Sequence, residues 1–290
     1  MIAGARQGRA IGLALALLGL FAPSAVKSAF SPQMASLHRE DRNKLWHLIH
    51  DSCAPAASRG IYPPSPCAEV VAPLESARGY AVLKDRDGRY QYLVLPLARI
   101  PGIESPALLA PDAPNYFADA WNARLYVEAA LHRLLPREEL GMVVNSTAGR
   151  SQDQLHIHVD CIRPDVRDAL RQLLPTMTGH WRPLDLPLPP HRHRYQALWV
   201  AGETLSVNPF KMLAASLPAS DRMGRHSLVV VGAYSPVGEP GFILLSGRVD
   251  RIRRDQGSGD ELQDLNCTTM DHPASWSHSR AVADSRTTSP

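Results

Sequence analysis

The segment 154–161 (QLHIHVDC) restricts the possible folds of this chain more than any other. Apolar and polar residues alternate along it, and successive side chains of a β-strand point to opposite faces. The residues predicted to face a core are Leu155, Ile157 and Val159. The residues predicted to share the other face are Gln154, His156 and His158. We therefore expect a strand that holds three polar side chains side by side on a rigid support.

The rest of the chain predicts an α+β fold whose sheet is mostly antiparallel. Apolar spacing typical of helices occurs at 36–50, 115–135, 164–174 and 209–217. Further strands are expected at 79–84, 90–96, 140–145, 195–201, 227–233 and 241–246. An Asp-Gly step, which favours tight turns, joins the first two of these strands into a hairpin, and the last two form a second hairpin. Proline-rich connections occupy 96–114 and 175–190.

The N-terminus has the order of a secretory signal, with basic, then apolar, then small residues. Arg6 and Arg9 precede the apolar run 11–22, which is shorter than the ~20 residues that a transmembrane helix needs. An internal core helix is the alternative, but the run is apolar on every face and begins near the chain terminus. We expect residues 1–25 to be a signal peptide or an N-terminal membrane anchor.

Length and charge limit the remaining function classes. At 290 residues with 44% hydrophobic residues, the chain can form one large or two small folded domains. We expect one domain over 30–270, with an optional subdomain break near 182–192, and a disordered polar tail at 271–290. A net charge of +3 without a basic stripe argues against a dedicated nucleic-acid-binding protein.

Four cysteines follow the N-terminal segment, namely Cys53, Cys67, Cys161 and Cys267. An even number in an exported protein favours two disulfides. A local bridge between Cys53 and Cys67 would leave Cys161 to pair with Cys267, although three pairings are formally open and buried free thiols are the alternative. None of the cysteines has the Cys-x-x-Cys spacing of zinc sites, and no metal or other cofactor is expected.

A glycine-containing turn, 145–151 (NSTAGRS), precedes the polar face and can present backbone N–H groups to phosphate. The turn and the strand together resemble the histidine-triad superfamily, whose motif alternates histidines with apolar residues. The three places of that motif are taken here by Gln154, His156 and His158. The superfamily's upstream Asn and its Gly-x-Ser step are matched by Asn145 and by Gly149-Arg150-Ser151.

A closer resemblance is to the bacterial CDP-diacylglycerol pyrophosphatase family, a branch of the superfamily that carries Gln-Leu-His-Ile-His. Further strings that resemble this family are 45–53 (LWHLIHDSC), 66–70 (PCAEV), 161–166 (CIRPDV) and 208–214 (NPFKMLA). The resemblance covers most of residues 40–270. It implies a HIT-like fold and the hydrolysis of CDP-diacylglycerol to phosphatidate and CMP, at the periplasmic side of the bacterial inner membrane.

The resemblance also implies roles for the residues of the motif. The middle histidine, His156, would attack the α-phosphorus and form a nucleotidyl-histidine intermediate that water then hydrolyses. His158 would contact the phosphate or orient the nucleophile. The residues expected to bind phosphate or leaving-group oxygens are Asn145, Gly149, Arg150 and Ser151. Gln154 can donate a hydrogen bond but no proton, which suits a phosphatidate leaving group that is already stable as an anion.

Other interpretations stay open. Two histidines two residues apart can bind zinc with a third ligand, for which the candidates are Asp160, His180 and the pair His191 and His193. The two histidines can instead be structural. The chain can also be an exported nucleotide- or lipid-binding protein without catalysis, or act on another nucleotide pyrophosphate or acceptor. The basic stretch 191–194 (HRHR) is a candidate contact for anionic lipid headgroups.

Overall fold

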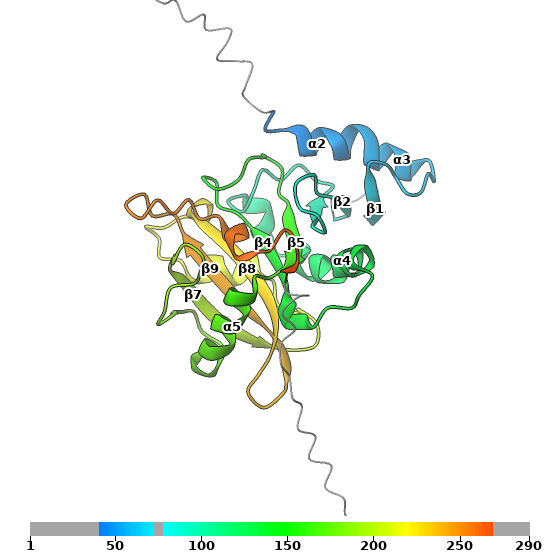
Figure 1. Cartoon of the computed structure of the whole chain (residues 1–290). Helices are drawn as coiled ribbons and strands as arrows, with labels where there is room; N and C mark the ends of the chain where they lie inside the picture. The colour runs from blue at the N-terminus through cyan, green and yellow to red at the C-terminus, as the bar shows by residue number, and fades with distance from the viewer. Residues whose placement is uncertain (1–40, 72–77, 269–290) are drawn as a thin grey trace, which may run out of the picture. The chain divides into compact units, whose positions relative to one another are not determined.

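The structure, a computed structural model, describes residues 41–71 and 78–268. A nine-stranded sheet forms the centre of this part of the chain (Figure 1). The strands in chain order are β1 Cys67–Val71, β2 Tyr80–Lys84, β3 Tyr92–Pro96, β4 Leu140–Val144, β5 Ile157–Cys161, β6 Arg182–Pro183, β7 Tyr195–Ala201, β8 His226–Tyr234 and β9 Pro240–Arg248. They lie in the spatial order β1-β2-β3-β5-β4-β8-β9-β7-β6, and all neighbouring strands are antiparallel. The predicted α+β class is confirmed. The predicted N-terminal segment, 1–25, and polar tail, 271–290, lie outside the described residues.

Helices cover both faces of this sheet. The longer ones are α2 Lys44–Leu48, the π-helix η1 Ile49–Cys53, α3 Ala54–Ser58, α4 Tyr116–Leu131, α5 Pro164–Leu173 and α6 Pro209–Ser216. Short 3-10 turns are η2 Pro106–Leu109, η3 Arg137–Glu139, η4 Leu174–Thr176, η5 Met223–Arg225 and η6 Gly259–Leu262. One apolar cluster packs α4 and α6 against one face, and a second cluster packs α5 against the other. A third cluster, around η1, α3 and β1–β3, covers the rest of the α5 side.

The apolar cover on the α5 side is interrupted at β5. His158 on β5 pairs with Leu93 on β3, which belongs to the cluster around η1. On its other side it pairs with Val143 on β4, which belongs to the α5 cluster. Side chains of residues paired across strands share a face of the sheet. His158 therefore lies between two apolar clusters, in an interval that polar side chains fill.

The N-terminal helical segment ends later than predicted, and residues 41–43, at the described start of the predicted range, are not helical. The sequence predicts a helix over 36–50 and a proline-rich loop from Cys53 to Cys67, whereas helical structure continues as far as Ser58. The wider π turn, Ile49–Cys53, is separated by Ala54 alone from Pro55, whose missing N–H group removes one helical bond. The proline-rich loop is correspondingly shorter. Residues 36–40 lie outside the described part of the chain.

β5 begins later than predicted, at Ile157 rather than at Gln154. Its partner β3 ends at Pro96, which has no N–H group to continue the ladder. The chain leaves the sheet over 154–156, where the Leu155 N–H group donates to the Ile100 carbonyl oxygen over 2.6 Å. The apolar side of the segment is buried against the α4 cluster as predicted. Residues 154–156 thus lie directly beyond the end of the β3–β5 ladder.

The other predicted elements lie close to their predicted positions. Both hairpins are present, as β2–β3 and β8–β9. The predicted linker 175–190 contains the short strand β6, which pairs with β7. One sheet therefore continues across residues 182–192.

Candidate active site

His156 is held in one tautomer by a backbone carbonyl group two residues before it. Its Nδ1 lies 2.7 Å from the carbonyl oxygen of Gln154. Because a carbonyl oxygen can only accept, the ring carries its proton on Nδ1 and a lone pair on Nε2. The side chain is 7% exposed, and burial, reinforced by the neighbouring His158, lowers the pKa of His156 to about 3. At neutral pH the ring is uncharged and its Nε2 is in the nucleophilic form.

Gln154 presents an acceptor, not a donor. Its Nε2 donates to the carbonyl oxygens of Pro96 and Ala98, both at 2.9 Å. These two acceptors determine which way the amide is turned. The Gln154 Oε1 atom is fully buried and has no hydrogen-bond partner among the described residues. The donor role that the sequence suggests does not match this arrangement, in which the free atom can accept a hydrogen from water or from a hydroxyl group.

His158 lies beside His156, with ring centroids 4.8 Å apart. Its Nδ1 faces Oε1 of Gln91 over 3.1 Å. Its Nε2 is buried and has no hydrogen-bond partner in the part of the chain that the structure describes. His156 thus has an unpaired polar atom on each side of it along the chain, Oε1 of Gln154 and Nε2 of His158. Unpaired buried polar atoms are costly and are usually explained by a role in ligand binding or catalysis.

The turn before the motif is stabilised from within. The Ser146 hydroxyl accepts from the N–H groups of Ala148 and Gly149, at 3.1 and 3.0 Å. The Ser146 carbonyl oxygen accepts from the N–H groups of Gly149 and Arg150. Ser151 is exposed, and no described residue hydrogen-bonds its hydroxyl. Of the predicted phosphate-binding groups in this turn, the Ser151 hydroxyl is therefore available, whereas the Gly149 amide is already paired.

Asn145 joins the turn to the C-terminal segment. Its Nδ2 donates to Oδ2 of Asp260 over 2.9 Å, and its Oδ1 accepts from the Asp260 N–H group over 3.3 Å. Both polar ends of the side chain are thus paired with η6. The predicted contact between Asn145 and phosphate stays a prediction, and the structure adds a second, structural role.

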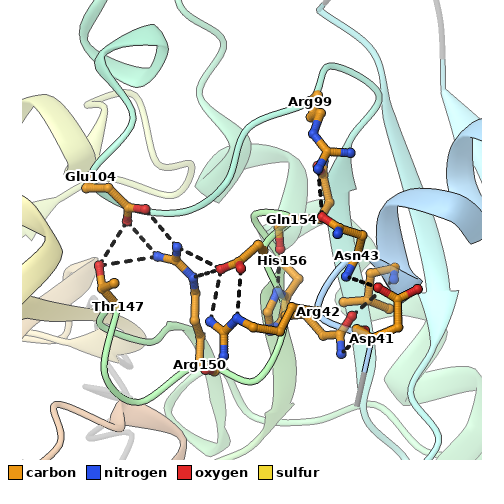
Figure 2. A network of polar contacts seen from close by, with 12 residues as sticks. Asp41, Arg42, Asn43, Arg99, Glu104, Thr147, Arg150, Gln154 and His156 are labelled. Carbon is orange, nitrogen blue, oxygen red and sulfur yellow. Dashed lines mark hydrogen bonds and ion pairs between the residues drawn. The ribbon is translucent and has the colours of Figure 1, made fainter. Parts of the chain in front are cut away.

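Arg150 is the centre of an ion-pair network at the edge of the site (Figure 2). Its guanidinium group contacts Glu104 at 2.6 Å and Asp153 at 3.0 Å, and its side chain is 7% exposed. Asp153 also accepts from Arg42 at 2.7 Å, and this hydrogen bond is the main reason why the pKa of Asp153 falls to about 2. The positive charge of Arg150 is therefore balanced by two carboxylates. The network fixes the shape of the turn and ties it to Arg42, near the start of the described chain.

The segments that form this site lie inside a region that matches known proteins. A sequence profile of the CDP-diacylglycerol pyrophosphatase family matches residues 40–271. The chain belongs to the CDP-diacylglycerol pyrophosphatase family. A relative named CDP-diacylglycerol pyrophosphatase, from Yersinia pestis, is 38% identical over 237 residues, which cover 81% of this chain and 88% of the relative.

Among the described residues, no group with metal-ligand spacing includes His156 or His158. In the described part of the chain, the one group of three residues with metal-ligand spacing is Asp160, Cys161 and Cys267. Both cysteines of that group are in a disulfide, so neither can supply a thiolate ligand. Among the candidate third ligands for zinc, His193 is instead paired with Glu261 at 2.8 Å. The described residues therefore do not support the zinc interpretation.

Two disulfides place this family member outside the cytoplasm. Cys53 is bonded to Cys67 and Cys161 to Cys267, which is the local and long-range arrangement considered from the sequence. Disulfides of this kind form and persist in oxidising compartments. Among the described helices, none has the length and apolar character that crossing a bilayer requires.

Sequence reasoning missed the residues that hold the motif from a distance. Arg42 and Glu104 bind the turn from 111 and 46 positions away from their partners in it. Gln91 and Gln263 lie around His158 and are both almost fully buried. No spacing rule connects such distant residues. Gln91 alone gave a weak signal, as a polar residue within the mostly apolar run 90–96, whereas Arg42 and Gln263 lie in polar stretches.

Proposed function

We propose that the chain hydrolyses CDP-diacylglycerol to phosphatidate and CMP through a nucleotidyl intermediate on His156. The family supplies the substrate and the type of reaction. The observation that supports the mechanism is the bond from His156 Nδ1 to the Gln154 carbonyl oxygen, which leaves Nε2 unprotonated. A neutral imidazole is a competent nucleophile, and here burial keeps it neutral.

In the first step, the Nε2 lone pair of His156 attacks the phosphorus that carries cytidine. The bond from that phosphorus to the bridging oxygen breaks, and phosphatidate leaves with the electron pair. The imidazole gains positive charge as the new P–N bond forms. The Gln154 carbonyl oxygen, 2.7 Å from Nδ1, lies where it stabilises that charge.

In the second step, water attacks the same phosphorus and the P–N bond breaks. CMP leaves, and His156 recovers its lone pair. The proton of the water passes to Nε2 of His158, and Oε1 of Gln154 accepts a hydrogen bond from the same water. Both atoms are buried and unpaired in the structure, which supports these roles. Proton transfer of this type contributes roughly 10²- to 10⁴-fold to a rate.

The turn supplies the substrate-binding side. We assign the exposed Ser151 hydroxyl to a phosphate oxygen, together with the second N–H of the Asn145 side-chain amide, whereas the backbone N–H groups around Gly149 are already paired within the turn. Arg150 contributes through the shape that its two carboxylate partners impose on the turn. The N-terminal segment would bring the enzyme to the membrane that contains the lipid, at the periplasmic side, either as a signal peptide or as an anchor.

The test is turnover of CDP-diacylglycerol in mixed micelles by wild type, His156→Ala and, as a matched control, His180→Ala. His180 is exposed and remote in sequence from the motif. We expect wild type and His180→Ala to release CMP, and His156→Ala to release none. Mass spectrometry of quenched wild type should show a CMP-sized adduct on His156. Full activity of His156→Ala would refute the nucleophile, and retention of unchanged nucleotide by wild type would indicate a binding protein.

A further inference from the structure

The orientation of His158 depends on a chain of buried amides that begins in the C-terminal segment. Gln263 lies directly after η6, and its Nε2 donates to the carbonyl oxygens of Gly141 (2.9 Å) and His158 (3.1 Å). Because carbonyl oxygens only accept, the amide can be turned only one way. Its Oε1 atom must then face away from those strands, as an acceptor.

The next amide follows from the first. Nε2 of Gln91 donates to Oε1 of Gln263 at 3.4 Å and to Oδ2 of Asp160 at 3.3 Å. With its N–H groups used, Gln91 presents Oε1 to Nδ1 of His158. An amide oxygen can only accept, so the ring proton of neutral His158 lies on Nδ1. The lone pair is left on Nε2, which has no hydrogen-bond partner among the described residues, in a ring whose centroid lies 4.8 Å from that of His156.

Asp160 closes the network from the other side. It is fully buried, and burial raises its pKa to about 8, so the carboxyl group is largely protonated at neutral pH. Its Oδ1 accepts from the Cys161 N–H group and lies 3.4 Å from the Cys267 sulfur. A disulfide sulfur has no proton to give, so a hydrogen bond there requires the proton to be on Asp160. Oδ2 then remains an acceptor for Gln91.

We propose that Gln91 and Gln263 are positioning residues that keep the proton of His158 on Nδ1 and so present its Nε2 as the base beside His156. The role in turnover rests on the proposed function, whereas the tautomer does not. A simple anchoring role explains the network less well. The backbone of Gln263 is already bridged to Ile162, and the neighbouring Asp264 N–H group bonds to the Cys161 carbonyl oxygen.

The first experiment reads the tautomer in the wild-type protein. Nitrogen NMR of protein labelled with ¹⁵N-histidine distinguishes a protonated from an unprotonated ring nitrogen, and a His158→Gln sample identifies the resonances. We expect His158 to carry its proton on Nδ1 at mildly alkaline pH. A ring protonated on Nε2 alone would refute the proposal without any variant having to fold.

The second experiment measures turnover by Gln91→Leu, Gln263→Leu and the double variant, with Gln196→Leu on the exposed side of β7 as control. We expect each single change to lower kcat by about 10-fold, which is typical of losing an outer partner of a catalytic group, with KM for the lipid little changed. The double variant should be no slower than the slower single variant, because the two amides act in series. Folded Gln91→Leu with wild-type kcat would overturn the proposal. Absence of CMP release by wild type would instead overturn the proposed function and leave the NMR result standing.

Discussion

The two faces of the segment 154–161, which contains β5, are held by different kinds of contact. On the α4 side, Leu155, Ile157 and Val159 are at most 1% exposed and pack into one continuous apolar cluster. On the α5 side, His158 and Asp160 are held by amides that come from distant parts of the chain. Apolar packing tolerates many side chains of similar volume, whereas each hydrogen bond needs a particular atom in a particular place. The apolar face therefore supports the strand, and the polar face holds the residues for which we propose a catalytic role.

The sharpest test of that contrast is His156→Ala. We expect CMP release to fall by at least about 10⁴-fold, as for the loss of other enzyme nucleophiles, because the covalent step is lost. The fraction of folded protein should fall far less than the rate of CMP release, because truncating one buried side chain costs only about 2–5 kcal/mol of unfolding free energy. Turnover assays and urea denaturation of the same preparation measure both quantities. If unfolding accounted for the whole loss of activity, the claim that the polar face serves turnover and the apolar face serves stability would be wrong.

The two disulfides provide a matched pair for the next comparison. Cys161–Cys267 spans 106 residues and holds the segment that carries Gln263, whereas Cys53–Cys67 spans 14 residues. Chain entropy predicts a stability loss of about 4.7 kcal/mol when the long loop is opened and about 3 kcal/mol for the short one.

Replacing the cysteines by serine in pairs separates stability from activity. We expect kcat to fall by about 10-fold only in the Cys161→Ser/Cys267→Ser protein, because the partner of His158 is then less firmly held. Denaturation and initial rates of both proteins check this. Equal kcat values for the two double variants would show that the C-terminal bridge has no part in the site.

Ile157→Ala probes the apolar face alone. The side chain is fully buried in the α4 cluster, so its truncation should cost about 3 kcal/mol of unfolding free energy. At a temperature where the variant remains folded, kcat should stay near that of wild type. Urea denaturation and steady-state rates on one sample decide the point. A loss of kcat larger than the loss of folded protein would mean that the two faces are coupled.

The smallest expected effect is a pH dependence of stability that originates in His156. Its pKa is about 3 in the folded protein, against an ordinary value of 6.5. As pH falls through this window, the unfolded chain binds a proton that the folded protein does not, so stability decreases on acidification. At pH 5 the penalty is about 2 kcal/mol, at 1.36 kcal/mol for each unit of pKa.

His156→Ala removes that proton and with it the penalty. The difference in unfolding free energy between wild type and His156→Ala should therefore shift in favour of the variant between pH 7 and pH 5. Urea denaturation at the two pH values measures it. A difference that does not change with pH would show that the ring is not kept neutral by burial.

Local periodicity was enough to predict the sheet class, both hairpins and the face of the motif that packs against α4. It failed where a distant residue decides the structure. The start of β5 depends on where Pro96 ends its neighbour, and the direction of the Gln154 amide depends on the carbonyls of Pro96 and Ala98. The partner of Gln91 lies 172 positions along the chain, and that of Asn145 lies 115 positions along. Alternation along a strand contains no information about such partners.

The position of Gln263 and Cys267 near the C-terminal end of the described chain has a consequence for how the enzyme matures. During synthesis, a growing polypeptide contains His156 and His158 long before it contains Gln263, which we propose to orient His158, and Cys267, which anchors that segment by a disulfide. Both histidines would therefore be present before the contacts that hold His158 in one tautomer can form. The step that completes the site would then be the docking and oxidation of the last described segment, which links the onset of activity to arrival in an oxidising compartment.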